Sequence, residues 1–328
     1  MKAIALISGG LDSRLAAKLV LQQGINLLGV HFTSLFSCSH DDQGETAEAR
    51  AAAKQLGIPL TIQDITEDLT RLVNDPPHGH GSGMNPCIDC RILQLRRAKR
   101  MMEENNARFI VSGEVVGQRP MSQRRGAMNV IEKEAGVEGL LLRPLSAHSL
   151  EPTIAENRGW VDRDLLRDFS GRNRTPQMEL AEKLGITDYP SPAGGCRLTD
   201  PHYARRVRDL RRHHELNLDN VRLLGTGRHF RLSDNARLVV GRSHEENLLI
   251  ESEVRDCDYL LVARQFPGPT ALGRGSFDDS LLRLAAAITA RYGQGREQKS
   301  VLVDVCRARN GAINIPPAED ERLTEYRL

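Results

Sequence analysis

Short apolar runs alternate with segments of helical periodicity through the first 145 residues, and this pattern constrains the fold more than any other feature of the sequence. The apolar runs predict buried strands at 3–7, 27–32, 60–65, 109–112 and 140–145. The segments between them predict helices at 13–23, 45–56, 88–105 and 118–136. Strands that alternate with helices favour a parallel sheet with helices on both faces. We therefore expect an α/β fold that binds ligands at the carboxyl ends of its strands.

The remainder of the chain predicts two further parts. Residues 146–220 form a polar, helical extension that contains the Pro- and Gly-rich loop "YPSPAGGCRLTDP" and a basic helix from His202 to about His214. From Val221 the pattern changes to two short strands, a helix, a strand, a second helix and a last strand. We expect three domains: 1–145, 146–220 and a smaller α+β domain over 221–328.

Bulk composition excludes several classes of protein. Six cysteines in 328 residues are too few for a disulfide scaffold, and a net charge of +2 implies no particular partner. A strand-like run begins at Lys2, which leaves no room for a signal peptide, and no apolar run reaches the length of a membrane span. The sequence predicts a cytoplasmic protein with no membrane association.

The junction "ALISGGLDSRLAA" places two glycines between the first strand and the first helix. Free backbone N–H groups and a positive helix end meet at such a junction, which suits phosphate. Ser8 and Ser13 add hydroxyl groups, and Asp12 can act on a metal ion that bridges phosphates. No Gly-Lys-Ser/Thr follows, and the pattern is not GxGxxG, so neither a Walker A loop nor a dinucleotide site is expected. The alternative is a tight turn with Asp12 as a helix cap.

"SGGLDS" resembles the pyrophosphate loop of the ATP pyrophosphatase (PP-loop) superfamily, which has an adenine nucleotide alpha hydrolase-like fold. Its members split ATP between the α- and β-phosphates and place AMP on a substrate oxygen. The resemblance implies ATP and Mg²⁺ as cofactors. The residues implied in nucleotide binding are Ser8, Gly9, Gly10, Asp12, Ser13, His31, Phe32, Ser112, Gly113 and Gln118. The loop does not separate ammonia-using amidating synthetases from tRNA-thiolating enzymes.

Three cysteines favour thiolation. Cys87 and Cys90 lie in "NPCIDC" just before a long helix, whose N-terminus lowers a thiol pKa, and Cys196 lies in "PAGGCRLTDP". Three thiolates could bind three irons of a [4Fe–4S] cluster, or act as a persulfide-transferring set. A zinc site completed by His78 or His80 stays open, as does a buried Cys196. The other cysteines, Cys38, Cys257 and Cys306, are expected to be packing residues.

The CxxC with a distant Gly-Gly-Cys is similar to the 2-thiouridylases, and "SGEVVGQRPMSQ" with "LLLRPL" resembles the 4-thiouridine synthetases. The resemblance implies a tRNA sulfurtransferase with Cys87, Cys90, Cys196 and Asp12 in catalysis, and a possible homodimer. Sulfur would come from sulfide or from a persulfide carrier such as a cysteine desulfurase. Many 4-thiouridine synthetases carry a rhodanese domain, and nothing here resembles one, which favours the cluster. A non-catalytic RNA-binding protein is the other alternative.

Two basic segments are candidates for RNA binding. The helix "HYARRVRDLRR" places Arg205, Arg208 and Arg212 on one face, where they could contact phosphates or form an ordinary solvated face. The segment "HFRLSDNARLVVGRSHEEN" resembles the RNA-binding domain of the NFACT proteins, which implies RNA contacts for Arg228, Arg231, Arg237 and Arg242. Aromatic residues are too few for base stacking to dominate.

Overall fold

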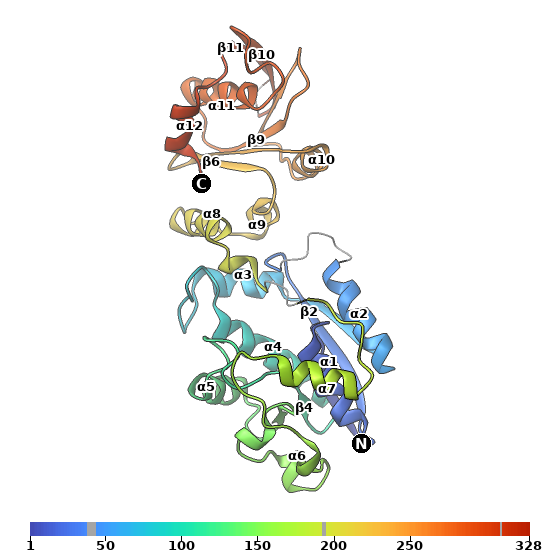
Figure 1. The fold of residues 1–328 in the computed structure, drawn as a ribbon. Coiled ribbons are helices and arrows are strands. Elements are labelled where there is room, and N and C mark those ends of the chain that lie inside the picture. The colour runs from blue at the N-terminus through green and yellow to red at the C-terminus, as the bar shows by residue number, and fades with distance from the viewer. Residues whose placement is uncertain (38–43, 192–194, 309) are drawn as a thin grey trace. The chain divides into compact units, whose positions relative to one another are not determined.

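The computed structural model describes residues 1–37, 44–191, 195–308 and 310–328. Its contacts divide the chain into two compact units, Met1–Thr199 and Asp200–Leu328, which Figure 1 colours from blue to yellow-green and from yellow to red. Among the described residues, no helix is both long enough and apolar enough to span a membrane.

The first unit is built on a five-stranded parallel sheet in the order β3-β2-β1-β4-β5. The strands are β1 (Lys2–Leu6), β2 (Asn26–Thr33), β3 (Leu60–Asp64), β4 (Ile110–Val111) and β5 (Leu141–Leu142). All four pairings are parallel, as the alternation of strands and helices predicts. The expected α/β class is confirmed.

Helices cover both faces of this sheet because the central strand is apolar on both sides. Ala3, Ala5 and Ile7 lie in one core with α1 (Leu11–Leu21), α2 (Gly44–Leu56) and α7 (Thr175–Lys183). Ile4 and Leu6 lie in the other core with α4 (Cys87–Glu104) and α5 (Arg125–Ala135). Successive side chains of a strand point to opposite faces, so an uninterrupted apolar run needs two covering layers.

Several elements of the first unit were not expected from the sequence. Helix α3 (Thr66–Asn74) follows β3 directly, and α5 begins at Arg125 rather than at 118. The part of the predicted helical extension that belongs to this unit contains, among its described residues, α7 and short pieces: η1 (Ala147–Ser149), α6 (Ile154–Asn157), η2 (Arg163–Leu165) and η3 (Arg197–Thr199). Short polar helices have weak periodicity, which explains why their bounds were missed.

The second unit has a six-stranded antiparallel sheet in the order β11-β10-β8-β9-β7-β6. Its strands are β6 (Arg228–Ser233), β7 (Ala236–Val240), β8 (Tyr259–Ala263), β9 (Thr270–Gly275), β10 (Val301–Arg307) and β11 (Gly311–Ile315). The α+β class is confirmed. Strand β9 was not predicted. The sequence predicted β10 as the last strand, whereas β11 follows it.

Helices pack on both faces of the second sheet. The helix α11 (Asp279–Arg291) packs on the strands in the larger core, and α9 (Leu218–Leu223) and α10 (His244–Ser252) pack on a smaller core around Val239 and Leu272. The basic helix α8 (Pro201–Arg212) opens the unit, and α12 (Asp320–Tyr326) closes it. Residues 200–220 belong to this unit by their contacts, whereas the sequence pattern predicted that the unit begins at residue 221.

Candidate active site and RNA-binding surface

The glycine loop lies between β1 and α1, at the carboxyl end of the central strand. Gly10 is the N-cap of α1, and Gly9 has a φ of +83°. A Cβ on Gly9 would lie 2.7 Å from the Cβ of Glu48, so both the backbone conformation and the space require glycine. Ser13 Oγ donates to the carbonyl oxygen of Gly10 at 2.9 Å, and Ser8 Oγ lies 3.2 Å from Ser13 Oγ. The loop is therefore ordered by its own side chains around a helix N-terminus.

Asp12 has one carboxylate oxygen that is held and one that is not. Gln118 Nε2 donates to Asp12 Oδ2 at 3.0 Å, which fixes the side chain. Asp12 Oδ1 is buried and has no hydrogen-bond partner among the described residues. A buried carboxylate oxygen without a partner is costly unless a cation or donor binds it. Carboxylate oxygens are the ligands that Mg²⁺ prefers, so Asp12 Oδ1 would hold this ion if it binds here.

The segment after β4 packs directly on the loop. A Cβ on Gly113 would lie 2.5 Å from the carbonyl carbon of Asp12 and from the amide nitrogen of Ser13, so only glycine permits this approach. Ser112 is buried, and its hydroxyl donates to Glu114 Oε2 at 3.2 Å. The backbone at Gly113 thus supports the loop, while the Ser112 hydroxyl is already used inside the protein.

His31 and Phe32 lie at the carboxyl end of β2, as expected, but His31 has a structural contact. Its Nδ1 lies 2.7 Å from the carbonyl oxygen of Ile7, and the ring is buried. Burial lowers the pKa of His31, although this hydrogen bond and the charge of Glu48 act in the opposite direction. Phe32 is partly buried against the α4–α5 core. The neutral His31 ring therefore ties β2 to the strand that leads into the loop.

The sequence did not point to Arg14, whose side chain holds the glycine loop through a hydrogen bond to Gly9. Its side chain is buried, and Nε donates to the carbonyl oxygen of Gly9 at 3.0 Å. Nη1 donates to Gln55 Oε1 at 2.8 Å and to the carbonyl oxygen of Asp188 at 2.6 Å. Burial lowers the pKa of Arg14, and the charges of Asp188 and Glu48 oppose that effect. An arginine inside an apolar helix pattern is the signal that could have found it.

A second buried network joins the end of β4 to the cysteine-bearing helix. Glu114 accepts from Arg91 Nε on α4 and from Arg143 Nε after β5, both at 2.8 Å, and Arg143 also pairs with Glu132. Burial would raise the pKa of Glu114, but the charges of Arg91 and Arg143 lower it to about 2. The Glu114 carboxylate is therefore ionised in the folded protein, and it links α4 to the strand ends.

The fold brings Cys87, Cys90 and Cys196 into one region. Cys87 and Cys90 lie in the first turn of α4, and Asn85 Nδ2 donates to Cys87 Sγ at 3.1 Å. Burial, together with the negative charge of the neighbouring Cys196 and Cys87 positions, raises the pKa of Cys90 to about 12, although Arg91 acts in the opposite direction. The expected lowering of the thiol pKa by the helix N-terminus is therefore wrong for Cys90. Desolvation and like charges outweigh the helix end.

The segments that carry these cysteines are held together by backbone contacts. Met84 N donates to the carbonyl oxygen of Leu198 at 2.8 Å, and Cys196 forms a β-bridge with Ser37. A Cβ on Gly83 would lie 2.1 Å from the carbonyl oxygen of Leu198. A glycine is thus required where the loop before α4 meets the Cys196 segment.

The described part of the chain contains no ready-made group of three His, Cys, Asp or Glu side chains around a metal position. Both histidines of the zinc alternative are engaged elsewhere: His78 Nδ1 lies 2.7 Å from Asp89 Oδ1, and His80 Nε2 lies 2.8 Å from the carbonyl oxygen of Val73. The donor set that remains consists of three neighbouring thiols, which is the chemistry that iron–sulfur clusters use.

The packing expected for the other cysteines is wrong at two of three positions. Cys257 and Cys306 are exposed, since one follows the α10 turn and the other faces outward from β10. Cys38 lies outside the described residues.

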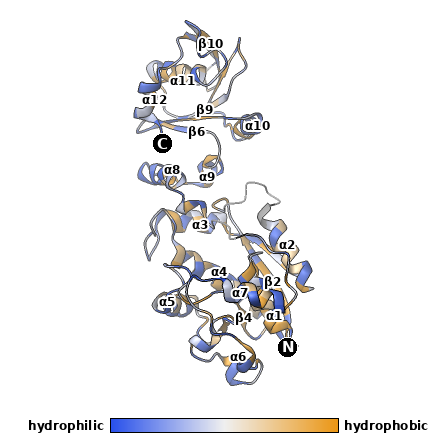
Figure 2. Ribbon diagram, in the orientation of Figure 1, coloured by the Kyte–Doolittle hydropathy of each residue, from blue (hydrophilic) through white to orange (hydrophobic). Residues whose placement is uncertain are grey.

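The seven candidate RNA-binding arginines fall into three groups. Arg205, Arg208 and Arg212 are exposed along α8, which is mostly hydrophilic in Figure 2. Arg228 and Arg242 are partly exposed: Arg228 Cζ lies 4.4 Å from the ring centroid of Tyr292, and Arg242 pairs with Glu246. In the third group, Arg237 is buried and Arg231 is half-buried, with 11% of its side chain exposed.

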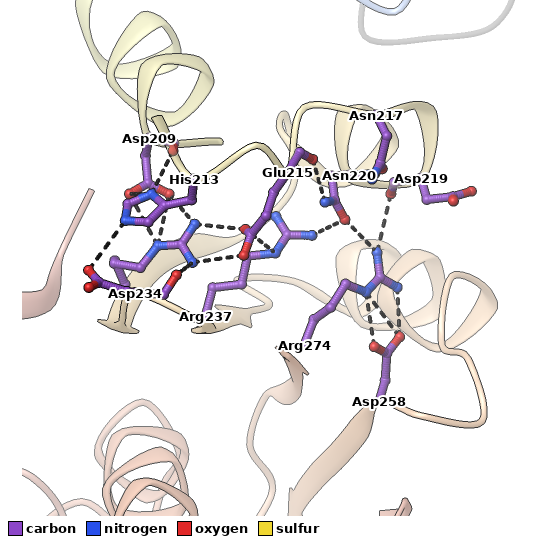
Figure 3. Close-up of polar contacts among 11 residues, drawn as sticks. Asp209, His213, Glu215, Asn217, Asp219, Asn220, Asp234, Arg237, Asp258 and Arg274 are labelled. Atoms are coloured by element: carbon purple, nitrogen blue, oxygen red, sulfur yellow. Dashed lines mark hydrogen bonds and ion pairs between the residues drawn. The ribbon is translucent and has the colours of Figure 1, made fainter. Parts of the chain in front are cut away.

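Both arginines belong to an internal network of polar contacts, in which Figure 3 shows Arg237 beside Glu215 and Asn220. Arg231 Nη2 pairs with Asp209 Oδ2 at 2.7 Å and with Glu215 Oε2 at 2.8 Å. Arg237 is 3% exposed and donates to Asn220, and burial, with the charge of Arg274, lowers its pKa to about 10. The expectation that Arg231 and Arg237 contact RNA is corrected by the structure, because carboxylates inside the domain already neutralise both side chains. Their role is to join α8 and α9 to the sheet.

The fold and the loop define an α/β domain, with a glycine loop at the carboxyl end of its central strand, followed by an antiparallel α+β domain. Residues 1–157 match the family described as thiamine biosynthesis protein (ThiI), and residues 227–327 match the NFACT protein RNA binding domain. The N-terminal part of the chain is thus similar to the ThiI family, and the C-terminal part is similar to the NFACT RNA-binding domain. The resemblances drawn from the loop and from the C-terminal segment are confirmed.

Individual relatives are similar over part of their length. The tRNA-specific 2-thiouridylase MnmA of Xanthobacter autotrophicus is 27% identical over 230 residues, which cover 64% of this chain and 54% of that protein. MnmA of Mycobacterium tuberculosis strain H37Rv is 34% identical over 104 residues, which cover 27% of this chain and 28% of that protein. The chain thus spans about half or less of the curated relatives that it matches.

Two solved structures resemble parts of the chain. A 4-thiouridine synthetase–RNA complex with bound ATP is 21% identical, with a TM-score of 0.36, and the match covers 56% of this chain and 51% of that one. The U34-tRNA thiolase NcsA of Methanococcus maripaludis with its [4Fe–4S] cluster is 18% identical, also with a TM-score of 0.36, and the match covers 68% and 70%.

Proposed function

We propose that this protein is an ATP-dependent tRNA sulfurtransferase that replaces a uridine oxygen with sulfur. One observation carries the proposal: the fold that builds the glycine loop also gathers Cys87, Cys90 and Cys196 in the same unit. An amidating synthetase with the same loop would leave these three thiols without a function. The matched ThiI family and the 2-thiouridylase relatives support the same reading.

In the proposed first step, the uridine oxygen attacks the α-phosphorus of ATP, and pyrophosphate leaves. The loop N–H groups and the N-terminus of α1 bind the phosphates, and Gly113 holds the loop in place. Asp12 Oδ1 would hold Mg²⁺, which neutralises developing charge on the phosphates when it is bound. Gln118 keeps Asp12 in position. The product is an adenylated uridine, from which the base oxygen leaves readily as part of AMP.

In the proposed second step, a sulfide ion (HS⁻) attacks the adenylated carbon and forms the C–S bond, the C–O bond breaks, and AMP leaves with the original oxygen. Cys87, Cys90 and Cys196 would hold a [4Fe–4S] cluster, which leaves one iron free to bind sulfide. The chain itself supplies three thiols and a helix N-terminus at α4, and Asn85 orients the Cys87 sulfur. A persulfide on one cysteine, with another as the resolving thiol, is the alternative source of sulfur.

Transfer RNA would be held by the exposed arginines of the second unit. Arg205, Arg208 and Arg212 lie on one helix face, and no ion partner is found for them within the described residues. Such contacts position an RNA backbone without reading its sequence. The match of residues 227–327 to an RNA-binding domain supports this assignment.

The test separates the two steps. Asp12→Asn should abolish tRNA-dependent pyrophosphate release, whereas Cys196→Ala should release pyrophosphate and form no thiolated RNA. Anaerobically purified protein should contain about four irons per chain, and Cys87→Ala, Cys90→Ala and Cys196→Ala should each lose most of them. Full thiolation by iron-free protein would show that the sulfur comes from a cysteine persulfide and not from a cluster. Pyrophosphate release that depends on ammonia and an acid substrate, with no requirement for tRNA, would overturn the function.

A further inference from the structure

Arginines from four segments of the second unit meet at one end of the β6–β7 hairpin. The hairpin pairs Arg228 with Val240, so Arg242 follows just beyond this pair, and Arg228 Nη1 donates to the intervening Gly241 carbonyl at 3.4 Å. The last residues of the chain run beside β6, where Arg327 forms a β-bridge with Phe230. Leu328 N donates to the carbonyl oxygen of His229 at 3.0 Å, which fixes this segment on the strand.

The fourth arginine, Arg206, reaches this place from α8. Its Nη1 donates to the carbonyl oxygen of Leu224 at 2.9 Å, and its Nε is buried without a hydrogen-bond partner in the described structure. A buried guanidinium N–H that lacks an acceptor is costly, and an incoming anion would satisfy it.

The charges around Arg206 are predominantly positive. Burial lowers the pKa of Arg206, and the positive charges of Arg242 and Arg327 lower it further, whereas Asp200 and Tyr203 raise it. Glu246 pairs with Arg242, and Asp200 is the carboxylate that acts on Arg206. Arg206 therefore lies near two further guanidinium groups, and an added anion would relieve their mutual repulsion.

We propose that Arg206, Arg228, Arg242 and Arg327 form a site for the phosphate groups of an RNA backbone, a proposal that rests on the proposed function. Guanidinium groups bind phosphate oxygens through paired, charge-assisted hydrogen bonds. Arg228 is held over the Tyr292 ring, which limits its freedom before the ligand binds.

The test measures binding of unmodified tRNA to the full chain without ATP, so it does not depend on thiolation. Arg327→Gln and Arg242→Gln should each weaken binding roughly tenfold near 0.1 M salt and reduce the slope of log affinity against log salt by about one. Arg206→Lys should weaken binding despite its charge, because it removes the Nε donor. Arg283→Gln, at an exposed arginine on α11, is the matched control and should bind normally.

Two results would overturn the site. The first is tRNA affinity within twofold of the wild type for both Arg327→Gln and Arg242→Gln, with an unchanged salt slope. The second is displacement of tRNA by inorganic phosphate at the concentration of RNA phosphates, which would assign a small free anion. If thiolation fails in every preparation while these variants still lose tRNA binding, the site stands and the proposed reaction falls.

Discussion

Replacing Glu114 by glutamine should destabilise the first unit by about 3 kcal/mol at neutral pH. The carboxylate is buried between Arg91 and Arg143, and Arg143 is only 3% exposed, so the change leaves two guanidinium groups beside a neutral amide. The pKa of Glu114 is about 2 in the folded protein against an ordinary 4.5. At about 1.4 kcal/mol for each pH unit between the two values, the ionised carboxylate contributes about 3 kcal/mol. Breaking a buried ion pair usually costs about 3–5 kcal/mol, which agrees.

The same pKa difference predicts how this contribution depends on pH. Because the folded pKa is the lower one, the unfolded chain binds more protons between pH 4.5 and about 2, and acid favours unfolding. The stability difference between the wild type and Glu114→Gln should therefore be complete at pH 7. It should shrink as the pH falls below about 4.5 and approach zero near pH 2.

Urea unfolding followed by tryptophan fluorescence measures this directly. Trp160 is the only tryptophan of the chain and packs against the core of the first unit, so its signal reports on that unit. Glu138→Gln, at an exposed carboxylate nearby in sequence, is the control and should shift the midpoint little. A loss below about 1 kcal/mol at pH 7, or a difference that stays constant down to pH 3, would refute the electrostatic account of Glu114.

Two further predictions address the loop and the internal network. Gly113→Ala should lower ATP affinity at least tenfold in calorimetry because its Cβ would displace the Asp12–Ser13 peptide, whereas Gly126→Ala, which meets no atom within 4 Å, should bind ATP normally. Equal affinities for these two variants would contradict the role of Gly113. Arg231→Met should destabilise the second unit by about 3 kcal/mol because it leaves the Asp209 and Glu215 carboxylates without this partner. Arg205→Gln should instead weaken tRNA binding with no change in the melting temperature. A stable Arg231→Met protein with weakened tRNA binding would return Arg231 to the RNA surface.

Some site residues are placed by the local sequence, and others are placed by contacts between segments far apart in the chain. Ser8, Gly9, Gly10 and Ser13 were predictable because the chemistry of a strand–Gly-Gly–helix junction is local. The role of Arg14 was not predictable, since its acceptors include carbonyls of Gly9 and of the distant Asp188. For Arg231, a charged residue in a short strand looked exposed, and only the approach of Asp209 and Glu215 shows that it points inward.

The sequence by itself determined the parallel sheet, its two helical layers and the position of the glycine loop. These follow from periodicity and from glycine, which act over a few residues. Only the tertiary structure decided which charges are buried, because burial depends on segments far apart in the chain. It paired Glu114 with Arg91 and Arg143, gathered Cys196 with the α4 cysteines and closed Arg237 inside the second unit. The free energy of a charge depends on what surrounds it, and no local pattern contains that information.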